Sequence, residues 1–113
     1  MACAVIVHQQ VESEIWRLKS RWRARHGAQL ASIAVAEHKA RASASFRRPT
    51  KVFEDGVQKS DNKYLLSLDG IIASRGGIPL IEGGKLIGAI GCSGATGSQD
   101  EAACMAGAAT INK

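Results

Sequence analysis

Apolar and small residues recur at helical spacing through AQLASIAVAEHKARASASF, residues 28–46, which contains neither Gly nor Pro. This pattern predicts one long helix. We expect the helix to pack closely through a face of mostly small residues, formed by Ala31, Val35, His38, Ala42 and Phe46. The helix should end before Pro49, because the residue preceding a proline is disfavoured in helical conformation.

Beyond Tyr64 the spacing changes to short apolar runs that are typical of strands. Residues 78–81 (IPLI) and 85–92 (KLIGAIGC) flank the turn sequence Glu82–Gly84. We predict a β-hairpin from these two runs. Pro79 has no N–H to donate, so its strand should lie at an edge of the sheet or pair elsewhere through alternate groups.

Proline and glycine mark the ends of two shorter helices. Pro49 is suited to open a short helical piece that Gly56 would end, and an Ala-rich helix should begin after Gly97. Ser98 and Glu101 have the spacing of a capping box at the start of that last helix.

The glycines that precede this helix resemble a phosphate-binding loop but do not match one. They recur at every third position, which fits neither the dinucleotide fingerprint nor the P-loop: Gly88, Gly91, Gly94 and Gly97. Asp100 and Glu101 would also repel a phosphate at the helix start. We therefore interpret residues 88–101 as a strand end, a turn and a helix start.

A length of 113 residues and a hydrophobic content of 45% fit a single domain. No apolar run approaches the roughly 20 residues that span a bilayer, and the N-terminus lacks the features of a signal peptide. We expect a cytoplasmic protein without membrane segments. Cys3, Cys92 and Cys104 form no C-x-x-C pair, so we expect three reduced thiols in or near the core.

The net charge of +5 is concentrated in residues 8–26, where five basic residues stand against two acidic ones. Ile15, Leu18 and Trp22 form a narrow apolar stripe there. Binding of nucleic acid or another anionic surface through residues 15–25 is one interpretation. A solvated amphipathic helix is the other, and we favour it because no nucleic-acid recognition motif accompanies the charge.

Three ordered stretches carry a family resemblance: AEHKARASASFRRPTKVFEDGV, GGIPLIEGGKLIGAIGCSGATGSQDE and the AAC that follows. Together they resemble the GlcG/HbpS family of haem-binding, so-called haem-degrading, proteins and the C-terminal domain of PduO-type corrinoid adenosyltransferases. The resemblance runs from about Gly27 to the C-terminus, and CAVIV near the N-terminus resembles the family's first strand. It implies an α+β fold, with a profilin-like antiparallel sheet flanked by helices, and assembly into homo-oligomers.

Residues 8–26 depart from the family pattern, where a turn and a second strand are expected. The chain thus reads as one domain, residues 1–113, with an atypical or truncated N-terminal part. A local change of reading frame is our hypothesis for the departure. Resequencing the gene tests it.

The resemblance directs attention to groups that could hold haem. Haem iron takes His, Cys, Met or Tyr as axial ligands, and basic groups pair with the propionates. His38 is the candidate iron ligand, with Lys39 and Arg41 as candidate propionate partners. Cys92 is a further candidate, although a buried inert thiol is the simpler interpretation. The lesser candidates are His8 and His26 in the atypical segment and Met105, which we expect in the core.

The residues do not favour an enzyme. GCSGA, residues 91–95, misses the G-x-S-x-G nucleophile elbow because Ala95 stands where the second glycine belongs. We therefore expect a small haem- or tetrapyrrole-binding homo-oligomer, accessory to a glycolate, glycerol or propanediol utilisation operon as the resemblance implies. The alternatives are nucleic-acid or anionic-surface binding and a structural oligomer without a ligand.

Overall fold

The computed structural model describes residues 2–7 and 30–112, and the side chains of residues 31–112. Its elements confirm an α+β fold. In chain order they are β1 (Ala2–Val7), α2 (Leu30–Phe46), α3 (Lys51–Gln58), the 3-10 helix η1 (Lys63–Ser67), β2 (Gly77–Glu82), β3 (Lys85–Ser93) and α4 (Gly97–Ala108). All of the basic segment, residues 8–26, lies outside the described residues. None of the helices described here has the length and apolar character needed to cross a membrane.

The three described strands form one antiparallel sheet in the order β1-β3-β2. The predicted hairpin is confirmed, and its turn residues Gly83 and Gly84 both have positive φ, 57° and 77°. Two such residues fit the tight hairpin turns that match the twist of a sheet. The edge position predicted from Pro79 is also confirmed. The side-chain amide of Asn112 pairs with the outer edge of β2, donating to the Pro79 carbonyl and accepting from the Ile81 N–H.

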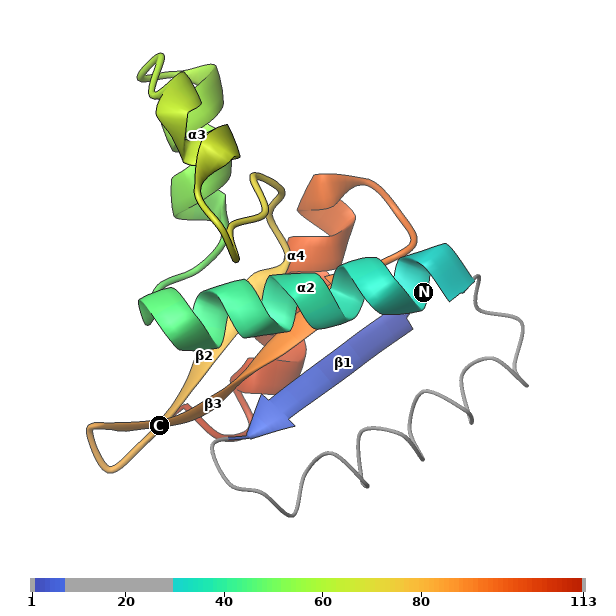
Figure 1. Cartoon of the computed structure of the whole chain (residues 1–113). Coiled ribbons are helices and arrows are strands. Elements are labelled where there is room, and N and C mark those ends of the chain that lie inside the picture. The colour runs from blue at the N-terminus through green and yellow to red at the C-terminus, as the bar shows by residue number, and fades with distance from the viewer. Residues whose placement is uncertain (1, 8–29, 113) are drawn as a thin grey trace.

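Helices α2 and α4 cover opposite faces of this sheet (Figure 1). On one face, the backbone of α2 lies so close to β3 that a Cβ at Gly91 would clash with the Ala36 carbonyl oxygen. On the other face, Ile90 contacts α4 at Gly107. Successive residues of a strand point to opposite faces, which is consistent with this division.

The predicted long helix is confirmed as α2, but its predicted packing face is only partly right: Ala42 is buried and Val35 and Phe46 are half-buried. Ala31 and His38 are exposed, whereas Ile33, Ala36 and Ala40 are buried against the sheet. Alanine occurs on every side of this helix, so apolar spacing alone does not distinguish the packed face.

Helix α3 and η1 form an arm that extends away from the sheet (Figure 1). Gly56 does not end α3 as predicted but lies inside it, two residues before its end at Gln58. Glycine at this position lets η1 pack closely instead: a Cβ there would lie 2.7 Å from Cδ1 of Leu65 in η1, and that side chain would have to shift. The arm also presents exposed apolar side chains, Val52, Tyr64 and Leu66, and Leu68 directly after η1 is exposed as well.

Arg75 connects the arm to the start of α4. Its Nε donates to Glu54 Oε2 of α3 at 2.5 Å, and its side chain lies against Gly97. This hydrogen bond to the Glu54 carboxylate raises the pKa of Arg75 above its ordinary value, so the guanidinium stays charged throughout the working pH range.

We expect Arg75→Ala to loosen the arm, because α3 then loses its ionic connection to the body. Tryptic cleavage after Lys59 and Lys63 should accelerate several-fold, as followed by mass spectrometry. Arg48→Ala is the matched control, since Arg48 is exposed and its Nε donates locally, to the Phe46 carbonyl. Equal cleavage rates in the two variants would contradict this role for Arg75.

Helix α4 begins with a capping box, but not the predicted one. Thr96, rather than Ser98, is the N-cap: its hydroxyl accepts from the Gln99 N–H, and the Gln99 side chain accepts from the Thr96 N–H. The first turn is therefore satisfied within the helix itself, consistent with a turn and helix start in place of a phosphate loop.

Candidate functional site

The exposed face of α2 carries the candidate iron ligand. His38 lies in a line of exposed residues that recur at helical spacing, formed by Ala31, Ala34, His38, Arg41 and Ser45. Ala34 stands one turn before His38, at i−4, and its methyl group shields the imidazole little on that side, whereas Val35, at i−3, is half-buried. A planar ligand could approach the helix closely at this point. We call these five residues the α2 outer face.

Arg41 supplies a positive charge on the same face, one turn after His38. Its guanidinium forms an i,i+4 ion pair with the carboxylate of Glu37, and the Arg41 side chain remains 68% exposed. An exposed pair of this kind contributes little to stability. The guanidinium can therefore exchange Glu37 for another carboxylate, such as a propionate, at small cost.

Lys39 has a different role from the predicted one. Its ammonium is buried, with a side chain 2% exposed, and lies 3.1 Å from Asp100 Oδ2 of α4. It also donates to the Cys92 carbonyl at 3.0 Å, while Asp100 Oδ1 accepts from the Ala95 N–H. This ammonium is not open to a propionate at the surface. It joins α2, the end of β3 and the start of α4.

The prediction of three reduced thiols is wrong for two of them. Cys92 and Cys104 form a disulfide that joins β3 to α4, and both residues are fully buried. In this state Cys92 offers no thiolate to iron. Met105, expected in the core, is 55% exposed on α4. His8 and His26 lie outside the described residues.

Among residues 31–112, whose side chains are described, no group of three or more His, Cys, Asp or Glu residues is placed to hold a metal. A bare ion usually needs several protein ligands, whereas the porphyrin of haem supplies four nitrogens and leaves one or two positions for side chains.

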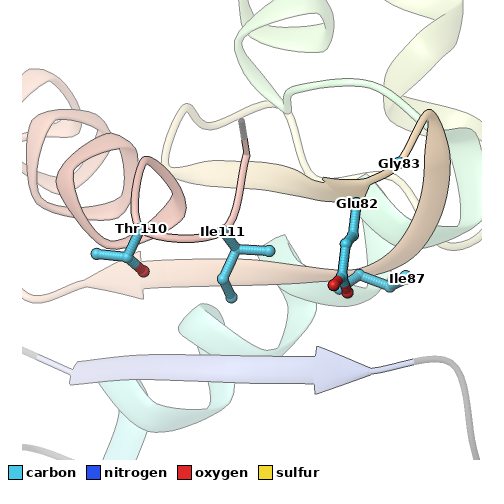
Figure 2. A pocket seen from close by; sticks show the side chains of 5 residues that line it. All are labelled: Glu82, Gly83, Ile87, Thr110 and Ile111. Atoms are coloured by element: carbon cyan, nitrogen blue, oxygen red, sulfur yellow. The ribbon is translucent and has the colours of Figure 1, made fainter.

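A groove of about 470 Å³ lies elsewhere, between the hairpin and the end of α4 (Figure 2). It is lined by Glu82, Gly83, Ile87, Thr110 and Ile111. None of these five residues supplies an axial ligand for haem iron, and Glu82 would repel a propionate. Sequence reasoning missed the groove because the fold alone brings residues 82–87 next to residues 110–111.

Comparison with known proteins decides the family. The model of the family described as "Haem degrading protein HbpS-like" matches residues 17–109. The chain belongs to this HbpS-like family. The match begins ten residues before Gly27, inside the segment that the sequence analysis set apart.

Solved HbpS-like structures share the fold. A double mutant of Streptomyces reticuli HbpS is 30% identical with a TM-score of 0.67, over 77% of this chain and 59% of that chain. Klebsiella pneumoniae ORFY is 30% identical with a TM-score of 0.67, and the match covers 75% of this chain and 61% of that chain. A PduOC:heme complex is 28% identical with a TM-score of 0.64, and the match covers 76% of this chain and 64% of that chain.

Among curated proteins, an uncharacterized 15.0 kDa protein in the dhaT-dhaS intergenic region of Citrobacter freundii is 38% identical over 72 residues. That alignment covers 61% of this chain and 51% of the relative. The HbpS-like chain thus matches about half to two thirds of the length of these relatives.

Proposed function

We propose that this HbpS-like chain binds haem or a related tetrapyrrole on the α2 outer face, with His38 as an axial ligand of the iron. The observation that carries the proposal is the exposed imidazole of His38 beside Ala34 and Ala31. A neutral imidazole is a common axial ligand, and small neighbours allow a flat ring to come close to the helix. Arg41 would pair with a propionate.

The family supports this proposal. The HbpS-like family is described as haem-degrading, and a structural relative was solved as a haem complex. We further propose that the protein acts in the cytoplasm as a homo-oligomeric accessory to a metabolic operon. The Citrobacter freundii relative, named for its place between dhaT and dhaS, supports a role tied to neighbouring genes.

The test is a titration of the purified chain with haem at micromolar concentration, followed by the Soret band. We expect a shifted band in the wild type and its loss in His38→Ala, with affinity falling at least about tenfold, because the iron loses its ligand. Arg41→Gln should weaken binding about two- to fivefold, the effect of one exposed charge pair.

The other two histidines provide matched controls. His8→Ala and His26→Ala should both keep the wild-type shift. Loss of the shift in either of them, with His38→Ala unchanged, would move the site away from α2. No Soret change in the wild type would remove the haem proposal and leave an accessory oligomer without a ligand. Nucleic-acid binding through residues 15–25 stays a prediction, because that segment lies outside the described residues.

A further inference from the structure

The fold brings all three cysteines of the chain to one part of the sheet. Cys92 on β3 is bonded to Cys104 on α4, with their Cα atoms 5.8 Å apart. On the β1 side of β3, the register of the sheet places Cys3 directly opposite Cys92. Directly opposed residues of an antiparallel pair are close enough for cross-strand side-chain interaction. Cys92 therefore has its disulfide partner on α4 and its register partner on β1.

The attachment of α4 to the sheet depends strongly on Cys92. Helix α4 buries three side chains, those of Asp100, Cys104 and Ala108, spaced one turn apart. Cys104 is bonded to the Cys92 sulfur, and Asp100 is bonded through Lys39 to the Cys92 carbonyl. Ala108 adds little apolar area. A change in the bonding of the Cys92 sulfur should thus alter how firmly α4 is held.

We propose that Cys3, Cys92 and Cys104 form a thiol–disulfide exchange site. The Cys3 thiolate attacks the sulfur of Cys92, a Cys3–Cys92 bond forms, and the Cys92–Cys104 bond breaks. Cys104 leaves as a thiolate. The proton that the Cys3 thiol gave up to solvent before the attack is balanced by the proton that the Cys104 thiolate takes up after it. The exchange conserves electrons and needs no external oxidant or reductant. It is independent of haem.

The two disulfide isomers hold different elements. In the Cys92–Cys104 isomer, β3 is bonded to α4. In the Cys3–Cys92 isomer, β3 is bonded to β1. The end of α4 is then held by weaker contacts, such as the Asn112 hydrogen bonds to Pro79 and Ile81. The Lys39–Asp100 pair still holds the first turn of α4 in both. Exchange therefore releases α4 from its C-terminal side and exposes a free thiol at Cys104.

Tryptic mapping distinguishes the isomers, because Cys92 and Cys104 share one peptide, residues 86–113, while Cys3 lies in residues 1–17. The full-length chain is incubated without reductant between pH 6 and 8, quenched in acid and digested. We expect peptide 86–113 with an internal disulfide at pH 6 and a growing cross-link between 1–17 and 86–113 as the pH rises. The rate should rise with pH, because the thiolate and not the thiol attacks a disulfide. Cleavage after Glu101 then shows whether Cys3 is joined to Cys92 or to Cys104.

Two variants complete the test. Cys3→Ser should keep the internal disulfide at every pH, with Cys104 closed to alkylation. Cys104→Ser should form the Cys3–Cys92 bond within one chain when treated with a small disulfide oxidant. Absence of the 1–17 cross-link in the wild type at pH 8 would overturn the proposal, as would a cross-link that forms only between chains and disappears on dilution. The wild-type arm decides the question even if Cys104→Ser fails to fold.

Discussion

Lys39→Met is expected to lower the free energy of unfolding by about 3 to 5 kcal/mol, the usual cost of removing one member of a buried ion pair. The ammonium is 2% exposed, and its loss leaves the Asp100 carboxylate, 4% exposed, without its counter-ion. The Cys92 carbonyl loses a donor as well. Urea denaturation of the variant, followed by circular dichroism, measures the change.

An exposed lysine on the arm provides the control. Lys59 pairs with Asp55 at 3.6 Å, but its side chain is 70% exposed, so Lys59→Met should cost less than about 1 kcal/mol. The double variant Lys39→Met/Asp100→Asn should recover part of the loss, because Asn removes the unpaired charge and still accepts from the Ala95 N–H. A Lys39→Met chain as stable as Lys59→Met would contradict the importance of the buried pair.

The role of Lys39 shows where sequence reasoning stops. Its neighbours in sequence place it on a helix beside His38, and that much is correct. Its partner Asp100 lies 61 residues away, and only the packing of α2 and α4 around the sheet brings the two together. The same holds for the disulfide: cysteines 12 residues apart in a strand and a helix carry no spacing signal that separates a bond from two thiols.

Glycine and proline positions predicted the structure better than the cysteines and Lys39 did, because these two residue types restrict the backbone directly. The hairpin follows from its two adjacent glycines, and the edge position of β2 follows from Pro79. A sign that α2 packs closely on the sheet lies in the strands and not in the helix itself. Gly77 and Gly91 are register partners in the sheet, and both lack a Cβ where the backbone of α2 passes. Glycines paired across two neighbouring strands therefore indicate a helix in close contact, although not which residues of the helix are in contact. The predicted strand began at residue 78, one residue after Gly77, so the sequence analysis did not contain this pair.

Gly91→Ala tests this close contact and should destabilise the fold by at least about 3 kcal/mol, the upper part of the usual range for overpacking. The added Cβ would clash with the Ala36 carbonyl oxygen and lie 2.7 Å from the Ala40 nitrogen. Both are backbone atoms of α2, so no side-chain rotation can relieve the clash. The helix would have to move away from the sheet and expose the apolar residues that it buries. Thermal or urea denaturation measures the loss.

Gly83→Ala separates this steric effect from the general cost of replacing a glycine. Gly83 lies in the hairpin turn at φ 57°, and a Cβ there would meet no atom within 4 Å. Its substitution should cost about 1 to 2 kcal/mol, the strain of a left-handed backbone conformation in a residue with a side chain. If Gly91→Ala proved no more destabilising than Gly83→Ala, α2 could shift outward at little cost. The close approach of the helix to β3 would then be a tolerated feature of the fold and not one that requires glycine at residue 91.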